Sequence, residues 1–201
     1  MAKRIYIDTE TTGLHHTEDE ILQIAICDDY GEQLWSEYYR PVRHESWDDA
    51  TRVNGIFPSD VADCRTLSEA VPEIQRIIDS ARVVFAYNAA FDLPFLEDAG
   101  LDFGRVATRC TMLEYAEYNG QPSTHHQGEY RWQKLVTAAR RCGYSYKPHD
   151  ALEDARAAAA VQVYMEKHPI PGKVIRCEYK CRTQMGSYKL GKMLGKLLNR
   201  G

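Results

Sequence analysis

The stretch Ile5-Tyr6-Ile7-Asp8-Thr9-Glu10-Thr11-Thr12-Gly13-Leu14 predicts a buried β-strand that ends in two carboxylates and a glycine turn. Its first three residues are β-branched or aromatic, as is typical of a strand inside a sheet. Residues i and i+2 of a strand point to the same face, so Asp8 and Glu10 leave that face together. Two close carboxylates repel each other unless a cation lies between them or one holds a proton. The pair therefore indicates a site for a hard divalent cation, the alternative being two acids that simply face water.

The order of apolar runs and helix signals predicts a mixed sheet covered by helices. Two strands joined by a short turn at 28–31 follow the first strand, which suggests an antiparallel meander. A capping box at 66–69 then opens an amphipathic helix. The expected strands after the first span 21–26, 33–40, 83–87 and 106–110, and the expected helices span 48–53, 66–80, 91–100, 112–118, 132–142 and 151–167, with a loop at 119–129.

Two further groups of polar residues are expected near the end of the first strand. Asn88 and Asp92 follow the fourth expected strand, and ligands of open α/β sheets gather at the carboxyl ends of strands. The alternative for Asp92 is an acid of the first helical turn that favours the helix dipole. In the last helix, Asp154 lies beside the alanine-rich face, whereas Glu153 points about 100° away from it. His149 precedes this helix in a loop, either as a functional group or as an ordinary surface histidine.

Composition and charge exclude several classes of protein. The 201 residues are 44% apolar, which is enough for one domain with a core, and no apolar run is long enough to span a membrane. The N-terminus leads directly into a strand without a signal peptide, and six scattered cysteines without a CxxC pair predict neither a zinc site nor disulfides. We therefore expect a cytoplasmic protein.

The charge is unevenly distributed along the chain. Residues 172–201 carry eight Lys and Arg against one Glu, a net charge of +7, which leaves −11 for residues 1–171 and −4 overall. The basic segment is either an arm that contacts phosphates or a docking segment, the alternative being a solvated helix face. Within it, residues 174–181 alternate as an edge strand would, and residues 188–198 have the pattern of an amphipathic helix.

Three motifs resemble, in order and rough spacing, those of the DEDDh 3′–5′ exonucleases. They are Asp8-Thr9-Glu10-Thr11-Thr12-Gly13, Asn88-Ala89-Ala90-Phe91-Asp92 and His149-x4-Asp154, and the resemblance covers residues 4–168. The residues of these motifs are most similar to those of the group that includes the epsilon proofreading subunit of DNA polymerase III and exonuclease X. Val53-Asn54-Gly55-Ile56 resembles a Val-His-Gly-Ile segment of that group with Asn54 replacing the histidine, and Tyr87 stands where a histidine is usual.

The resemblance implies a ribonuclease H-like α/β fold with a mixed five-stranded sheet, an exonuclease domain at 1–170 and a basic tail at 171–201. It implies removal of nucleoside 5′-monophosphates from the 3′ end of nucleic acid, DNA rather than RNA, in proofreading or repair. Two Mg²⁺ ions, for which Mn²⁺ can substitute, would be held by four acids, with a histidine as general base. The implied residues are Asp8, Glu10, Asp92 and Asp154 as metal ligands, His149 as base, and Thr11, Thr12, Gly13, Leu14 and Asn88 as substrate contacts.

The expected partners are single-stranded or 3′-frayed DNA and, through the tail, a DNA polymerase or another replication or repair protein. Three other functions remain open. They are an exoribonuclease or oligoribonuclease, a non-catalytic module that tethers a polymerase, and another two-metal hydrolase such as a phosphatase. The first remains open because no residue in the sequence is identified as a contact to the 2′-hydroxyl, which distinguishes RNA from DNA. The intact set of five catalytic positions argues against a non-catalytic module.

Overall fold

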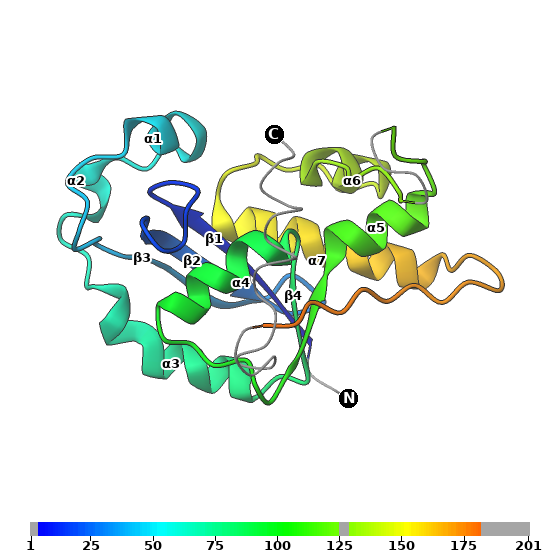
Figure 1. The fold of residues 1–201 in the computed structure, drawn as a ribbon, viewed down its shortest axis with the longest axis horizontal. Helices are drawn as coiled ribbons and strands as arrows, with labels where there is room; N and C mark the ends of the chain where they lie inside the picture. Colours follow the sequence, from blue (N-terminus) through cyan, green and yellow to red (C-terminus); the bar gives the residue numbers. More distant parts are fainter. Residues whose placement is uncertain (1–3, 125–128, 182–201) are drawn as a thin grey trace.

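The computed structural model describes residues 4–124 and 129–181 and contains a five-stranded mixed sheet flanked by helices (Figure 1). The strand order is β3-β2-β1-β4-β5, with β1 antiparallel to β2, β2 antiparallel to β3, and β4 parallel to both β1 and β5. The strands are β1 (Arg4–Thr11), β2 (Ile21–Cys27), β3 (Gln33–Tyr38), β4 (Val83–Ala86) and β5 (Ala107–Cys110). This confirms the predicted meander and the predicted ribonuclease H-like mixed sheet.

All six predicted helices are present, with ends that differ from the expectation by up to three residues, and a seventh, short helix among the described residues was not expected. The helices are α1 (Asp48–Asn54), α2 (Pro58–Val61), α3 (Leu67–Asp79), α4 (Ala89–Asp98), α5 (Thr111–Asn119), α6 (Leu135–Arg141) and α7 (Ala151–Lys167). Helix α2 was not predicted, because four residues are too few to show a helical period. Helix α6 begins at Leu135 rather than at 132, because the carbonyl oxygen of Gln133 accepts a hydrogen bond from the Tyr87 hydroxyl (2.7 Å) and Lys134 is extended. No helix in the described ranges has the length and apolar character needed to cross a bilayer.

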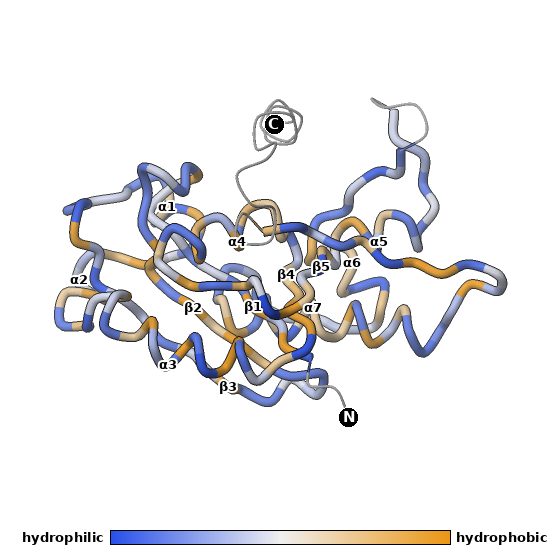
Figure 2. The backbone as a smooth tube through the Cα atoms, turned by 60° about the horizontal axis from the view of Figure 1, so that its bottom comes forward, coloured by the Kyte–Doolittle hydropathy of each residue, from blue (hydrophilic) through white to orange (hydrophobic). Residues whose placement is uncertain are grey.

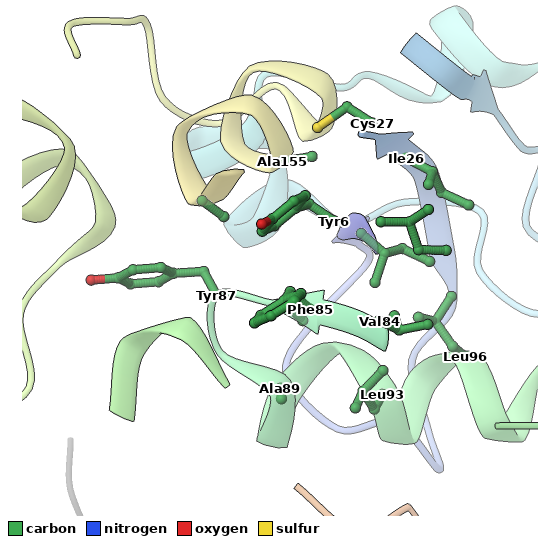
Figure 3. Close-up of a cluster of buried hydrophobic side chains, with 14 of the residues drawn as sticks. Tyr6, Ile26, Cys27, Val84, Phe85, Tyr87, Ala89, Leu93, Leu96 and Ala155 are labelled. Carbon is green, nitrogen blue, oxygen red and sulfur yellow. The ribbon is translucent and has the colours of Figure 1, made fainter. Parts of the chain in front are cut away.

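The core lies between the sheet and the helices on its two faces. Tyr6 and Phe85 stack with ring centroids 5.0 Å apart on the face that α7 covers, and Figure 3 shows Ala155 of α7 beside them. On the opposite face, Leu93 and Leu96 of α4 pack near Val84 (Figure 3). Five of the six alanines of α7 are buried and allow the helix to approach β1 and β2 closely. Figure 2 shows hydrophobic stretches within the strands and mostly hydrophilic loops around them.

The segment after α7 returns to the sheet and lies along β5, at the far edge from β3. The Tyr179 amide donates to the Thr108 carbonyl oxygen (2.9 Å), and the Cys110 amide donates to the Cys177 carbonyl oxygen (3.2 Å). The predicted edge strand at 174–181 is present only as an isolated bridge between Arg109 and Glu178. The predicted amphipathic helix at 188–198 lies outside the described residues.

This segment also covers a buried ionic group. The Glu114 carboxylate is 1% exposed and pairs with the Arg109 guanidinium, whose Nε and Nη2 lie 2.6 and 2.5 Å from its two oxygens. It also accepts hydrogen bonds from Gln162 Nε2 (3.0 Å) and from the Cys177 amide (3.1 Å). Cys181 is fully buried in the core. Residues 177–181 therefore contribute to burial and to hydrogen bonding in the folded domain.

Removing this segment is expected to destabilise the protein. A chain that ends at Pro171 loses the Cys177 amide from Glu114, the backbone bonds along β5 and the buried Cys181 side chain. We expect its melting temperature to lie about 6–15 °C below that of a chain that ends at Cys181, which corresponds to about 3–5 kcal/mol. Differential scanning calorimetry of the two truncated chains measures the difference. Equal melting temperatures would show that residues 172–181 do not stabilise the fold.

Candidate active site

An open cavity of about 640 Å³ lies where the parallel strands β1 and β4 end. More than 140 residues of chain separate the first and last of the acids that line it. The sequence-predicted residues in its lining are Asp8, Glu10, Asn88, Asp92, His149 and Asp154. The structure therefore brings all five predicted catalytic residues, and Asn88, into one site.

The alternation of β1 distributes its polar residues over the two faces of the sheet. Asp8 and Glu10 share a face with Tyr6, which α7 covers, and α7 supplies Asp154. Thr9 points to the other face, where its hydroxyl and its amide donate to Asp92 Oδ1 at 2.9 and 3.2 Å. These bonds hold the Asp92 carboxylate, which is 3% exposed, at the end of the sheet. Asp92 therefore joins the cluster from the opposite layer of the fold.

His149 and Asp154 are linked through the backbone. His149 has φ 68°, and no other non-glycine residue in the described ranges has a positive φ. This left-handed turn lies one residue before Asp150, the N-cap of α7. It directs the His149 amide to Asp154 Oδ2 (2.9 Å). The His149 side chain is exposed, and His149, Glu10 and Asp154 each offer a ligand atom within 4.8 Å of the others. As predicted, Asp154, which is buried, faces the sheet, whereas Glu153 points away and pairs with Arg156 (2.9 Å).

The crowding of carboxylates raises their pKa values. Burial, followed by the charges of Asp92 and Asp154, holds the pKa of Asp8 well above its usual range. Burial and the charge of Asp154 raise the pKa of Glu10 to about 8. The pKa of Asp92 is also raised by burial, although its bonds with Thr9 oppose the shift. Oxygen ligands that repel each other in this way fit hard divalent cations, which displace the protons when they bind.

Without metal ions, the stability of the protein is expected to fall as the pH rises from 5 to 8. Over this range the folded protein keeps protons on these carboxylates that the unfolded chain has lost, so the free energy of unfolding decreases with rising pH. Glu10, whose pKa is about 8 in the folded protein, releases its proton near the top of this range. We expect the melting temperature in chelator to fall by at least about 3 °C across the window, and magnesium to raise it more at pH 8 than at pH 5. A melting temperature that increases with pH in chelator would contradict this expectation.

Residues 11–14, which were predicted to contact the substrate, form a turn that lies outside the lining of this cavity. The Thr12 amide donates to the Glu20 carbonyl oxygen (2.8 Å), and its hydroxyl accepts from the Glu20 amide (2.9 Å), so both groups are used inside the protein. The Thr11 hydroxyl donates to the Gly13 carbonyl oxygen (2.6 Å). A Cβ on Gly13 would lie 2.4 Å from the Asp19 carboxylate, which explains the glycine. Leu14 is 74% exposed.

A second cavity, of about 690 Å³, shares His149 with the first. Its lining includes Asn54, Ile56 and Lys147. The Asn54 side chain donates to the Thr11 carbonyl oxygen (3.2 Å) and accepts from the Ile56 amide (3.0 Å). The 53–56 segment thereby closes against the end of β1. The residue that replaces the histidine of the resembled motif thus has a structural contact of its own.

Three residues of the first cavity were not predicted as functional. Tyr146 lies three residues before His149 and faces Asp154: burial raises the pKa of the Asp154 carboxyl, and the Tyr146 hydroxyl opposes that rise. Trp132 and Lys134 line the same cavity just before α6. The signal that was available is the aromatic and basic sequence Tyr-Arg-Trp-Gln-Lys at 130–134, which the expected helix at 132–142 obscured.

A mixed five-stranded sheet with acids at the carboxyl ends of its central strands defines a ribonuclease H-like nuclease fold. The chain belongs to the exonuclease family whose sequence model, RNase_T, matches residues 5–162. It is 31% identical to uncharacterized exonuclease CP81 of Escherichia phage 186 in a 170-residue alignment that covers 79% of this chain and 85% of the phage protein. It is 26% identical to the PolC-type DNA polymerase III of Thermotoga maritima in a 170-residue alignment that covers 78% of this chain and 11% of the polymerase.

Solved structures of nucleases share the fold. The nuclease domain of 3′hExo, a DEDDh family member bound to rAMP, has a TM-score of 0.68 and 17% identity over 89% of this chain and 97% of that domain. Exonuclease X in complex with 5′-overhanging duplex DNA has a TM-score of 0.60 and 22% identity, covering 86% of this chain and 95% of that one. E. coli exonuclease I with a dA16 oligonucleotide has a TM-score of 0.67 and 17% identity, covering 83% of this chain and 41% of that one. Identities this low establish the fold alone.

Proposed function

We propose that this protein is a metal-dependent 3′–5′ exonuclease that releases nucleoside 5′-monophosphates, preferentially from DNA. The observation that carries the proposal is the convergence of four acids and His149 on one cavity. Membership in the exonuclease family makes the reaction a phosphodiester hydrolysis. The 3′–5′ direction is supported by the DEDDh pattern of the motifs and by the shared fold of 3′hExo.

The chemistry follows from where these groups lie. Asp8, Glu10, Asp92 and Asp154 would hold two divalent cations, which lower the pKa of the attacking water and stabilise the departing 3′ oxygen. Mg²⁺ is the cation we propose, and Mn²⁺ is expected to substitute for it. His149 accepts the proton of the attacking water, because its exposed side chain lies at the mouth beside Glu10 and Asp154.

The proposed nucleic acid is DNA, single-stranded or frayed at its 3′ end, and the proposed role is proofreading or repair. The resemblance to PolC-type polymerase III supports this role, as do the oligonucleotide and duplex DNA bound by exonuclease I and exonuclease X. We propose that the catalytic residues belong to an exonuclease domain at residues 1–170, against which residues 177–181 pack along β5. Contact of the basic segment at 171–201 with nucleic acid or with a replication protein remains a prediction, since residues 182–201 lie outside the described chain.

A degradation assay with 5′-labelled substrates tests the proposal. Single-stranded DNA, double-stranded DNA and RNA of one sequence are incubated with magnesium, manganese or chelator. A 3′–5′ exonuclease produces a ladder of shortened labelled strands, whereas the opposite direction releases labelled mononucleotide at once. We expect a ladder from DNA that chelator abolishes. Faster degradation of RNA would favour an exoribonuclease, an unchanged strand would favour a binding module, and hydrolysis of a simple phosphomonoester would favour a phosphatase.

A further inference from the structure

We propose that Trp132 and Lys134 form a subsite for the strand upstream of the scissile phosphate, in which Trp132 stacks on a base and Lys134 pairs with a phosphate. This inference rests on the proposed exonuclease function. Both residues line the cavity that holds the four acids. Trp132 is half-buried and packs against the hydrophobic core, and Lys134 is exposed, so an indole ring and an ammonium group lie at the same wall.

The segment that carries these residues is fixed from two sides. The Tyr87 hydroxyl donates to the Gln133 carbonyl oxygen (2.7 Å), and Figure 3 shows Tyr87 at the edge of the core cluster with its hydroxyl directed away from Tyr6 and Phe85. On the other side, the Arg131 amide donates to the Gln121 carbonyl oxygen (2.8 Å), and Gln133 Nε2 donates to Gln121 Oε1 (3.1 Å). Tyr87 directly precedes Asn88, so the end of β4 positions both this predicted substrate contact and the proposed subsite.

Charge supports a strand path along this wall. Among the described residues that line the cavity, Lys134 is the sole lysine or arginine, whereas four lining residues are acids. Cations bound by the acids would neutralise the scissile phosphate, but the next phosphate of the strand needs a separate positive group. Stacking of a base on an aromatic ring tolerates any sequence, as a nuclease that removes successive nucleotides requires.

The proposal predicts that the segment acts on long substrates and not on the chemical step. The p-nitrophenyl ester of thymidine 5′-monophosphate has a scissile phosphate but no upstream nucleotide, and a 20-nucleotide single strand has both. We expect Trp132→Leu to lower kcat/KM for the 20-mer by about 10-fold, mainly through KM, and to change that for the ester less than about twofold. Trp132→Phe keeps an aromatic face and is expected to recover most of the loss.

The matched lysine control is Lys147, which lines the second cavity. Lys134→Met is expected to weaken the salt dependence of kcat/KM for the 20-mer by about 0.7 in the log–log slope, whereas Lys147→Met leaves the slope unchanged. The proposal is overturned if Trp132→Leu acts equally on both substrates, if it leaves the 20-mer unaffected, or if Lys147→Met alone changes the slope. If the wild-type protein hydrolyses neither substrate, the exonuclease function itself fails, which is a separate result.

Discussion

Replacing Asp8 by asparagine is expected to lower phosphodiester hydrolysis by about 10³-fold or more. Asp8 lies at the carboxyl end of β1, on the face of the sheet that α7 covers, and shares its cavity with three other acids. The amide has nearly the same shape as the carboxylate but lacks the negative charge that a divalent cation requires. The same change removes repulsion from a site in which burial and neighbouring acids raise the pKa of Asp8. We therefore expect the metal-free variant to melt at least about 3 °C above the metal-free wild type.

Two measurements check this pair of expectations. Release of mononucleotides under saturating magnesium reports the chemical step, and calorimetry in chelator at pH 7.5 reports the stability. Asp63→Asn is a suitable control, because Asp63 is exposed and outside the lining of both cavities. An Asp8→Asn variant that is inactive and also less stable without metal would indicate misfolding rather than loss of a ligand. Wild-type activity in this variant would refute the assignment of Asp8 as a metal ligand.

Replacing His149 by asparagine is expected to lower kcat by about 10²–10⁴-fold with little change in stability. The bond to Asp154 Oδ2 comes from the His149 amide, so the variant keeps it. Asparagine tolerates the left-handed conformation at φ 68° better than most residues, which avoids a backbone artefact. The loss should therefore report removal of the imidazole alone.

The test compares single-turnover rates, melting temperatures and Mn²⁺ binding of wild type and His149→Asn. We expect a slower rate, an unchanged melting temperature and nearly unchanged Mn²⁺ binding. His168→Asn provides the control, since His168 is exposed and follows the opposite end of α7. If His149→Asn weakens Mn²⁺ binding as strongly as it slows the reaction, the histidine is a metal ligand and not the general base. That outcome is compatible with its distance from Glu10 and Asp154 and would change its assigned role.

Several features of the site followed from local periodicity. The two-residue period of β1 placed Asp8 and Glu10 on one face, and the helical period of α7 chose Asp154 over Glu153. Other features did not follow, because distant residues decide them. The start of α6 depends on a hydrogen bond from the Tyr87 hydroxyl to the Gln133 carbonyl oxygen. The Thr12 amide donates to the Glu20 carbonyl oxygen and is therefore not available to a substrate.

The amino-acid sequence alone determined the type of sheet, the family resemblance and the five residues of the candidate active site. These depend on strand and helix periods and on short motifs, which are properties of neighbouring residues. Only the tertiary structure decided that Asp92 reaches the site through Thr9, that residues 177–181 lie along β5 over Glu114, and that Trp132 and Lys134 line the cavity that holds the four acids. Each of these depends on contacts between segments far apart in the chain, and burial and charge at such contacts arise only after the layers have packed.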